Sequence, residues 1–445
     1  MAKKVTLISL GCSKNLVESE QMIFVLEEAG FEISGDPKGA DAVIVNTCGF
    51  IESAKAEAVD TILEMAELKK NGELGVIIAA GCLAERYKDE MLTELPEIDA
   101  VVGVGAVGVI VEAVRAALER TPYCSFPDIN APIIEHERVV TTPVGWAYVK
   151  ISEGCDNRCA YCVIPAIRGS YRSRRMEDII TECRSLAANG AKELILVAQD
   201  TTRYGIDLYG RRALADLLRE ISRIEGVEWI RIHYLYPDGI NDELLDLIAE
   251  SPKILNYFDI PLQHVSDRLL RSMRRRYSGA EARVLINKIR KKMPECVIRT
   301  SIIVGLPGET REDFEELCEF LKEMQLERVG VFPYSAEEGT DAALMDGQID
   351  EDVKLTRLEA VYALQERVMD RFNKGQRGKI LKVLCEDYNP ETKFYSGRSF
   401  ADSPDVDGRI FFVSGRVIES GSFVDVLVEG RIETDLTGRT VDEEP

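Results

Sequence analysis

The sequence predicts an α/β protein with three parts: an N-terminal parallel α/β sheet domain, a central partial (β/α)6 barrel and a small C-terminal antiparallel β-barrel. Two observations predict this fold class. Apolar strand-like runs alternate with helical patterns through most of the 445 residues, and the last stretch changes to short strands separated by Gly, Asn and Pro. We expect the domains at residues 1–121, 144–374 and 376–442, with a linker at residues 122–143.

The first part contains three βα units, and each predicted strand leads directly into a cysteine: Cys12, Cys48 or Cys82. Because the carboxyl ends of parallel strands meet at one edge of a sheet, where ligands gather, we expect these thiols to lie together. Three thiolates fit an iron–sulfur cluster; a zinc site and three unrelated buried cysteines are the alternatives. The strand-like runs cover residues 5–10, 42–45 and 76–80.

Residues 103–108 match the dinucleotide fingerprint Gly-x-Gly-x-x-Gly, between a strand-like run and a helix expected at residues 109–118. No second strand with a terminal acidic residue follows, although a dinucleotide site needs one. We therefore expect the last βα turn of a small domain here, without a nucleotide. Residues 122–143 contain four prolines and no periodicity, which is typical of a linker.

A second set of cysteines, Cys155, Cys159 and Cys162, follows the first strand-like run of the central part. Three thiolates on one short loop can hold three irons of a cubic cluster and leave the fourth iron open to a small molecule. A tetrahedral zinc site would need a fourth ligand, and the nearest candidates, Cys183 and His136, lack finger-like spacing. The odd number of cysteines argues against a disulfide.

The central part has six strand-like runs with helical patterns between them, and barrels carry active sites at the carboxyl ends of their strands. The residues expected at that rim beside the cysteine loop are Gln199, Asp200, Thr201, Arg231, His233, Pro261, Gln263, His264, Gly305, Leu306, Pro307, Gly308 and Glu309. Two of these have structural alternatives: His264 as a satisfied histidine at a helix start, and residues 305–309 as a simple turn. Basic runs near residues 168–175 and 271–276 could contact a carboxylate. The strand-like runs cover residues 146–151, 193–198, 229–233, 257–260, 297–304 and 328–332.

The chain is acidic, with a net charge of −22, so nucleic acid and anionic membranes are unfavourable partners and a basic protein is a natural one. Residues 376–445 contain 14 acidic and 9 basic residues, which argues against RNA as the client of the last part. No apolar run is long enough for a signal peptide or a membrane span, so we expect a cytoplasmic protein. The remaining cysteines are expected to be small buried hydrophobic residues: Cys124, Cys183, Cys296, Cys318 and Cys385.

The Cys-x3-Cys-x2-Cys loop, with Tyr161 before its last cysteine, resembles the signature of radical S-adenosylmethionine enzymes. From end to end, the chain resembles the methylthiotransferase family of that superfamily, whose last domain is a TRAM module. The resemblance implies that Cys155, Cys159 and Cys162 are the catalytic residues and hold a 4Fe–4S cluster. It implies a second, auxiliary 4Fe–4S cluster on Cys12, Cys48 and Cys82. The contacts expected for S-adenosylmethionine are Tyr161, Gln199, Arg231, Gly305, Pro307 and Gly308.

Several stretches are most similar to the branch that modifies the twelfth protein of the small ribosomal subunit. The implied reaction adds a methylthio group to the β-carbon of an aspartate, with one S-adenosylmethionine as methyl donor and one as radical source. The implied partners are this basic ribosomal protein, free or in the ribosome, a sulfide source and a low-potential electron donor such as flavodoxin or ferredoxin. The stretches are residues 9–15, 46–51, 331–335, 338–340, 395–399 and 402–405.

Two other functions stay open. One is a tRNA-adenosine methylthiotransferase, although that branch typically has Gln or Asn where Ser13 and Lys14 stand, and a more basic tail. The other is a non-catalytic iron–sulfur electron carrier or RNA-binding scaffold. The sequence departs from many radical enzymes at residues 198–200, where Ala-Gln-Asp replaces Gly-Gly-Glu.

Overall fold

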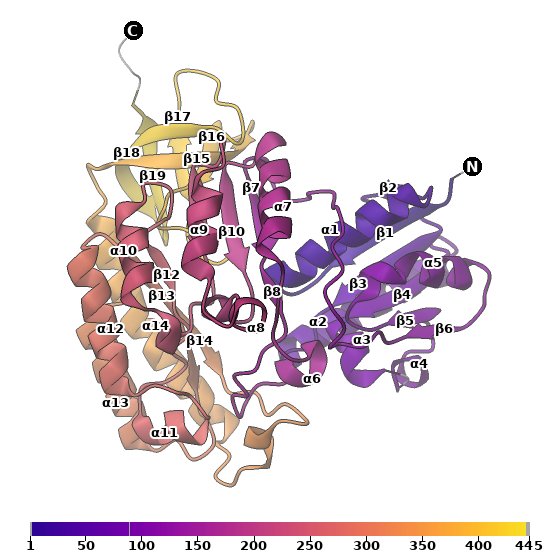
Figure 1. Cartoon of the computed structure of the whole chain (residues 1–445), viewed down its shortest axis with the longest axis horizontal. Coiled ribbons are helices and arrows are strands. Elements are labelled where there is room, and N and C mark those ends of the chain that lie inside the picture. The colour runs from indigo at the N-terminus through magenta and orange to yellow at the C-terminus, as the bar shows by residue number, and fades with distance from the viewer. Residues whose placement is uncertain (1, 89, 442–445) are drawn as a thin grey trace.

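Three structural units follow one another along the chain in the computed structural model, which describes residues 2–88 and 90–441. Figure 1 shows the N-terminal domain beside a central barrel, with the small C-terminal barrel against one end of the central one. The predicted α/β fold class is confirmed by this order of parallel and antiparallel sheets. The expected domain limits at residues 1 and 442 lie outside the described residues.

The N-terminal domain is a six-stranded parallel sheet in the order β2-β1-β3-β4-β5-β6. Helices α1 and α5 pack on one face, and α2 and α3 pack on the other. Burial on both faces explains why the inner strands β3 and β4 are apolar without alternation. The elements are β1 (Lys4–Ser9), α1 (Ser13–Glu28), β2 (Glu32–Ser34), β3 (Ala42–Thr47), α2 (Glu52–Lys70), β4 (Val76–Gly81), α3 (Cys82–Tyr87), α4 (Glu90–Glu94), β5 (Ala100–Val102), η1 (Ala106–Gly108), α5 (Ile110–Leu118) and β6 (Tyr123–Ser125).

The outer strand β6 lies in the segment predicted as a linker, and it pairs with β5. It therefore extends the sheet of the first domain past residue 121. The glycine-rich loop at residues 103–108 precedes α5 and β6. The Glu85 carboxylate occupies the space beside it and accepts a hydrogen bond from the Val104 amide at 3.1 Å. A Cβ added at Gly103 would lie 2.0 Å from that carboxylate, so the loop has glycine for close packing.

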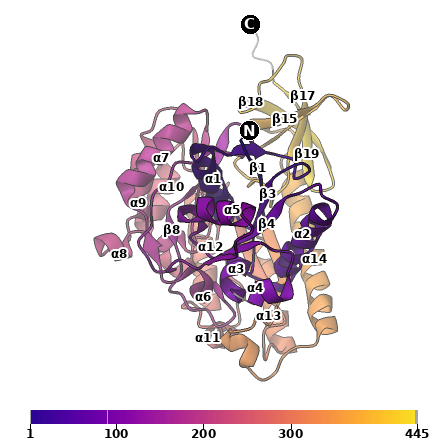
Figure 2. The same ribbon diagram turned by 90° about the vertical axis from the view of Figure 1, so that its right-hand side faces the viewer.

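The central barrel is formed by six parallel strands in two sheets, β7-β10-β11 and β12-β13-β14. A parallel bridge between Ile230 and Ile254 joins the sheets, and helices cover the outside (Figures 1 and 2). The strands are β7 (Trp146–Lys150), β10 (Glu193–Val197), β11 (Trp229–Ile232), β12 (Tyr257–Asp259), β13 (Val297–Val304) and β14 (Arg328–Pro333). The helices are α6 (Ile164–Arg168), α7 (Met176–Ala188), α8 (Ile206–Tyr209), α9 (Leu214–Ser222), α10 (Asp242–Glu250), α11 (Asp267–Ser272), α12 (Gly279–Lys292), α13 (Arg311–Met324) and α14 (Glu351–Lys374). The remaining elements are β8 (Ser152–Glu153), β9 (Arg172–Ser173), η2 (Thr201–Arg203), η3 (Pro237–Gly239) and η4 (Asp341–Leu344).

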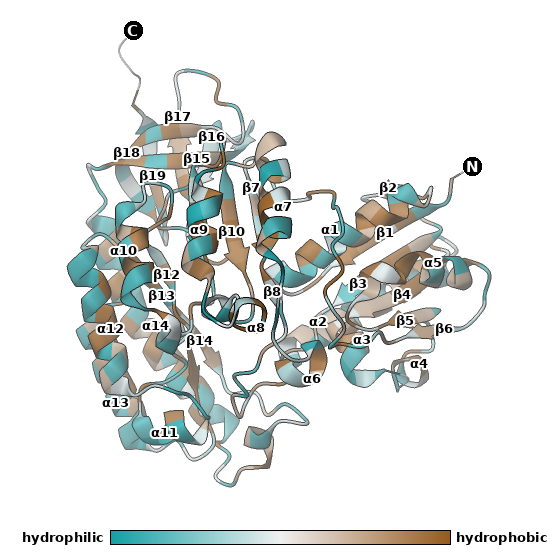
Figure 3. Ribbon diagram, viewed as in Figure 1, coloured by the Kyte–Doolittle hydropathy of each residue, from teal (hydrophilic) through white to brown (hydrophobic). Residues whose placement is uncertain are grey.

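Hydropathy follows this architecture closely. Figure 3 shows apolar strands inside the barrel and outer helices that are polar on the side away from the strands. The largest core lies between the strands and the surrounding helices, as expected for amphipathic helices that cover a barrel. Within residues 2–88 and 90–441, a helix both long and apolar enough to cross a membrane is not found.

The C-terminal module is a closed five-stranded barrel in the order β15-β16-β17-β19-β18. It covers the amino ends of the central strands. The start of β10 provides Glu193, whose carboxylate pairs with Arg231 of β11 and with Arg398 of the module, both at 2.7 Å. Ser403 reaches further in, with its Oγ 2.8 Å from Nε2 of His233. The module therefore contacts the barrel mainly at the amino ends of the strands, and the cysteine loop lies beyond the carboxyl end of β7. The module strands are β15 (Ile380–Asn389), β16 (Phe394–Arg398), β17 (Ile410–Val413), β18 (Phe423–Ile432) and β19 (Asp435–Thr440).

Removal of the Glu193 carboxylate should weaken the attachment of the C-terminal module to the barrel. Burial alone raises the pKa of Glu193, but the guanidiniums of Arg398 and Arg231 outweigh burial and lower this pKa overall. Glu193→Ala would leave two buried guanidiniums without this partner, so we expect a loss of about 3–5 kcal/mol in unfolding free energy. Chemical denaturation measures the loss, and limited proteolysis detects release of the module.

Glu228→Gln is the matched control, because Glu228 pairs with Lys382 of the module at 2.6 Å on the exposed side of the same interface. Its cost should be about 1 kcal/mol or less. Equal losses in the two variants would contradict the role given to the buried carboxylate.

Candidate functional site

The loop with Cys155, Cys159 and Cys162 lies between β8 and α6, beyond the carboxyl end of β7. Backbone bonds hold it on two sides: the Cys155 amide donates to the Gly169 carbonyl, and the Ala160 amide donates to the Met273 carbonyl, both at 3.1 Å. The start of the loop needs glycine, because a Cβ added at Gly154 would lie 2.1 Å from a backbone oxygen. The three thiols are therefore placed by main-chain geometry.

The environment of these thiols suits a bound cation better than three free thiolates. Burial raises the pKa of Cys155 to about 12, and burial followed by the charge of Cys159 raises the pKa of Cys162. The guanidinium of Arg275 lies 3.5 Å from the Cys159 sulfur and 3.4 Å from the Tyr161 hydroxyl. A metal cluster would bind all three sulfurs as thiolates, and its positive irons would offset the repulsion between them.

The second set, Cys12, Cys48 and Cys82, forms at the carboxyl edge of the N-terminal sheet, as predicted. A Cβ added at Gly11 would lie 2.6 Å from the Cβ of Cys48, so the loops that carry Cys12 and Cys48 touch. Burial raises the pKa of Cys82 to about 12, and the charges of Cys12 and Cys48 contribute in the same direction. Burial alone would raise the pKa of Cys12, but Lys14 and Arg168 lower it overall.

Among residues 2–88 and 90–441, no group of three His, Cys, Asp or Glu side chains is arranged to hold a single metal ion. That finding concerns one ion with converging ligands. The thiolates of a four-iron cluster each bind a different iron, so they need not converge on one point. The two sets therefore fit a cluster by their number, burial and loop geometry.

A buried polar cluster connects the two cysteine sets across the domain boundary. Arg168 of α6 donates to the Glu153 and Glu18 carboxylates, both at 2.9 Å, and its other nitrogen donates to the Asn15 side chain. Asn15 also lies 3.7 Å from the Cys82 sulfur, and Glu153 comes just before the cysteine loop. Figures 1 and 2 show the elements that carry these residues together, with α1 beside β7 and α3 beside α6.

This cluster was not predicted, because Arg168 is 150 residues from Glu18 and 153 residues from Asn15, and no local pattern marks them as partners. Arg168 was noted only as part of a basic run. Asn15 and Glu18 lie on α1, a helix whose buried side includes many polar residues. A buried polar helix face is a signal of partners elsewhere, but sequence alone cannot name them.

Two predicted cofactor contacts lie near the cysteine loop. Tyr161 belongs to the loop, and Gln199 has its amide nitrogen 3.5 Å from the Glu153 carboxylate. The Gln199 side-chain oxygen is buried without a hydrogen-bond partner, so it is available to a ligand. Leu306, within the predicted glycine turn, packs in the same apolar cluster as Ala160 and Tyr161. The turn is therefore beside the loop.

The glycine turn also has internal roles. Gly305 has φ +76°, and an added Cβ would lie 2.3 Å from the Lys354 side chain of α14. The Glu309 carboxylate accepts hydrogen bonds from the amides of Gly305 and Leu306. Gly308 donates from its amide to the Gly347 carbonyl at 2.8 Å. Pro307 lies in the middle of this turn. The contacts named above join parts of the chain to one another and explain the turn without a ligand.

Arg231 lies away from the predicted rim. Its guanidinium pairs with Glu193 and donates to the carbonyls of Phe400 and Ser399, at the interface with the C-terminal module. The side chain extends toward the amino ends of the strands and is fully buried there. The prediction placed this side chain at the cofactor. Its actual direction is set by partners in the C-terminal module.

His264 has the contact expected at a helix start, because its Nδ1 accepts a hydrogen bond from the Ser266 amide at 3.0 Å.

Among the cysteines expected in the core, Cys183, Cys296 and Cys385 are buried and Cys318 is half-buried. Cys124 is exposed, so its predicted burial is wrong. It lies on the short strand β6, at the edge of the sheet beside β5.

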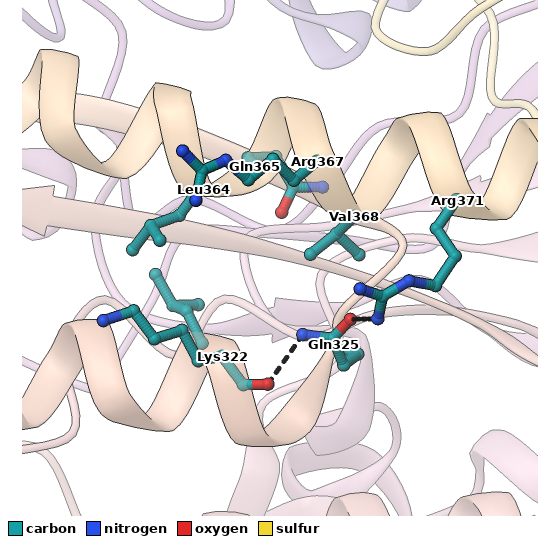
Figure 4. Close-up of a pocket in the computed structure, with 8 residues that line it drawn as sticks. Lys322, Gln325, Leu364, Gln365, Arg367, Val368 and Arg371 are labelled. Carbon is teal, nitrogen blue, oxygen red and sulfur yellow. Dashed lines mark hydrogen bonds between the residues drawn. The ribbon is translucent and has the colours of Figure 1, made fainter.

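A surface cavity of about 210 Å³ lies between α13 and α14 (Figure 4). Figure 4 shows long polar side chains around it, and the Gln325 amide donates to the Lys322 carbonyl within it. None of the predicted site residues lines this cavity. It is therefore separate from the two cysteine sets.

Comparisons with protein families agree with the three structural units. Residues 149–321 match the radical SAM superfamily, residues 4–103 match the uncharacterized protein family UPF0004, and residues 378–441 match the TRAM domain. The solved structure of the radical S-adenosylmethionine methyltransferase TsrM from Kitasatospora setae, with cobalamin and a 4Fe-4S cluster, has a TM-score of 0.55. It is 15% identical and covers 75% of each chain, so the likeness concerns the fold.

The chain also matches curated proteins along its whole length. It is 50% identical to the ribosomal protein uS12 methylthiotransferase RimO of Pelotomaculum thermopropionicum, over 99% of this chain and 100% of that protein. It is 47% identical to the RimO of Acetivibrio thermocellus, over 100% of this chain and 99% of that protein. At this identity and coverage, the chain belongs to the RimO family of radical S-adenosylmethionine methylthiotransferases.

Proposed function

We propose that this protein adds a methylthio group to the β-carbon of an aspartate in ribosomal protein uS12. The observation that carries the proposal is the meeting of two three-cysteine sets at one domain boundary, in a chain that matches RimO proteins from end to end. One S-adenosylmethionine would donate the methyl group and a second would supply the radical. A non-catalytic electron carrier would not need a cluster with an open iron.

We propose two 4Fe–4S clusters, one on Cys155, Cys159 and Cys162 and one on the N-terminal set. When bound, the first cluster supplies the electron that cleaves S-adenosylmethionine, and the second holds the sulfur to be transferred. The chain supplies positions for these groups. Arg275 neutralises charge at Cys159, and Gln199 offers an unpaired oxygen beside the loop. Arg168 and Asn15 fix one set relative to the other.

The acidic surface supports a basic protein as substrate. The net charge is −22, and the C-terminal module contributes to it. Such a surface attracts a basic ribosomal protein and repels tRNA. We also propose a sulfide source and a low-potential donor such as flavodoxin or ferredoxin as partners. A reducing compartment such as the cytoplasm would keep the six thiols available for clusters.

The auxiliary cluster can be tested at Gly11. Gly11→Ala would place a methyl group 2.9 Å from the Cys48 sulfur, so reconstituted protein should lose the second cluster and keep the first. Iron analysis and electron paramagnetic resonance measure cluster content. Gly30→Ala is the matched control, because Gly30 has φ +88° against +86° at Gly11 but nothing within 4 Å of an added Cβ. It carries the same backbone strain of about 1–2 kcal/mol, and full loading is expected.

The reaction can be tested by product analysis without oxygen. Reduced protein receives S-adenosylmethionine, sulfide, uS12 and bulk tRNA together, and mass spectrometry locates the methylthio group. We expect the gain on an aspartate of uS12. A gain on tRNA adenosine instead would refute the proposed substrate while leaving the fold and both cysteine sets in place.

Single cysteine variants separate the two sets. Cys159→Ala should abolish formation of 5′-deoxyadenosine, because the first cluster loses a ligand. Cys48→Ala should keep uncoupled cleavage of S-adenosylmethionine and stop transfer of the methylthio group. Transfer by Cys48→Ala at the wild-type rate would refute the auxiliary cluster.

A further inference from the structure

Lys14 is a buried cation that lacks a carboxylate partner. It lies in the first turn of α1, two residues after Cys12, and only 6% of it is exposed. Its Nζ lies 3.7 Å from the centre of the Tyr234 ring, across the domain boundary. Within the part of the chain that the structure describes, no Asp or Glu oxygen lies within 4 Å of this nitrogen. A charge in such a place is costly until an anion joins it.

The neighbouring cations Arg168 and Lys150, unlike Lys14, have carboxylate partners. Arg168 is held by Glu18 and Glu153, and Lys150 pairs with the same two carboxylates at 2.8 and 2.9 Å. Those two cations are satisfied by the protein itself and serve the domain boundary. Within the described residues Lys14 has no carboxylate partner. Its ammonium lies over the Tyr234 ring and near the Cys12 thiol, and an ammonium has three donors to share.

Lys14 also lies between the two cysteine sets. On one side, its own helix begins at Cys12. On the other side, the Tyr234 carbonyl accepts a hydrogen bond from the Thr201 amide at 3.1 Å. Asp200, the residue before Thr201, accepts a hydrogen bond from the side chain of Asn157 in the cysteine loop at 2.8 Å. A short chain of contacts therefore leads from one set to the other through Tyr234 and Lys14.

The start of α1 favours an anion at the same place. The first turn of this 16-residue helix contains no acidic residue, and the amides of Lys14 and Asn15 face the Cys12 side chain. Free amides and the helix dipole give a helix start a partial positive charge. Together with the ammonium of Lys14, they form a positive site at the inner edge of the N-terminal domain.

We propose that Lys14 binds the side-chain carboxylate of the target aspartate and selects for it. This inference rests on the proposed function. The carbon that reacts must lie between the radical source and the sulfur, and in an aspartate that carbon is bonded directly to the carboxylate. A carboxylate bound by Lys14 would therefore hold the β-carbon between the two cysteine sets. The other carboxylate present in the reaction is that of S-adenosylmethionine, and the test separates the two.

The experiment measures binding of uS12, and of uS12 with its target aspartate replaced by asparagine, to the full-length protein with its clusters. Wild type should bind the aspartate form roughly tenfold or more tightly, since a hydrogen bond to a charged group is worth about that factor. Lys14→Met should lose this preference, while uncoupled cleavage of S-adenosylmethionine and its KM stay unchanged. Lys4→Met is the control, because Lys4 lies exposed at the opposite end of β1 and should keep the preference.

Three results would overturn the proposal: an unchanged preference in Lys14→Met, a raised KM for S-adenosylmethionine, or a lost signal of the auxiliary cluster. The second would assign the lysine to the cofactor carboxylate, and the third to support of the cluster. Failure of the proposed function looks different, because wild type itself would then modify tRNA and not uS12. Wild type that modifies uS12 without any preference for the aspartate form would refute the lysine site alone.

Discussion

At the boundary between the N-terminal domain and the barrel, one buried guanidinium joins the segments that carry the two cysteine sets. Arg168 binds Glu18 and Asn15 of α1 and Glu153, which stands just before the cysteine loop. Asn15 lies 3.7 Å from the Cys82 sulfur, and Glu153 stands two residues before Cys155. A reaction that passes a group from one site to another needs a fixed separation, and a fully satisfied charge cluster in a dry boundary supplies it. Loss of Arg168 would be costly, because the buried carboxylates of Glu18 and Glu153 would keep Lys150 but lose their second counterion.

The two ends of the central barrel have different tasks. At the amino ends, Glu193, Arg231 and Arg398 join the barrel to the C-terminal module, and Ser403 enters as far as His233. At the carboxyl ends, the thiols of Cys155, Cys159 and Cys162 and the unpaired side-chain oxygen of Gln199 lie around the cysteine loop. This division follows the general rule for barrels, in which stability residues gather at one end and chemistry at the other.

Much of the fold was predictable because its signals are local. Cys155, Cys159 and Cys162 are close in sequence, and Cys12, Cys48 and Cys82 each follow a strongly apolar strand. The strands β2 and β6 were not predicted, since three residues are too few to show a period. Arg231 was placed at the wrong end because a long side chain can extend along a strand in either direction. Its actual partners come from residues 399 and 400, which only the folded chain brings close.

The position of the C-terminal module has a consequence for how the protein is made. During synthesis, the barrel strands leave the ribosome before the module does, because domains emerge in chain order. Until Arg398 and Ser403 emerge, Glu193 lacks one of its two cations and the interior around His233 has no cover. The barrel therefore reaches its final form only when nearly the whole chain has been translated. A nascent chain that stalls before this point would present an open, charged barrel end, which chaperones and proteases can recognise.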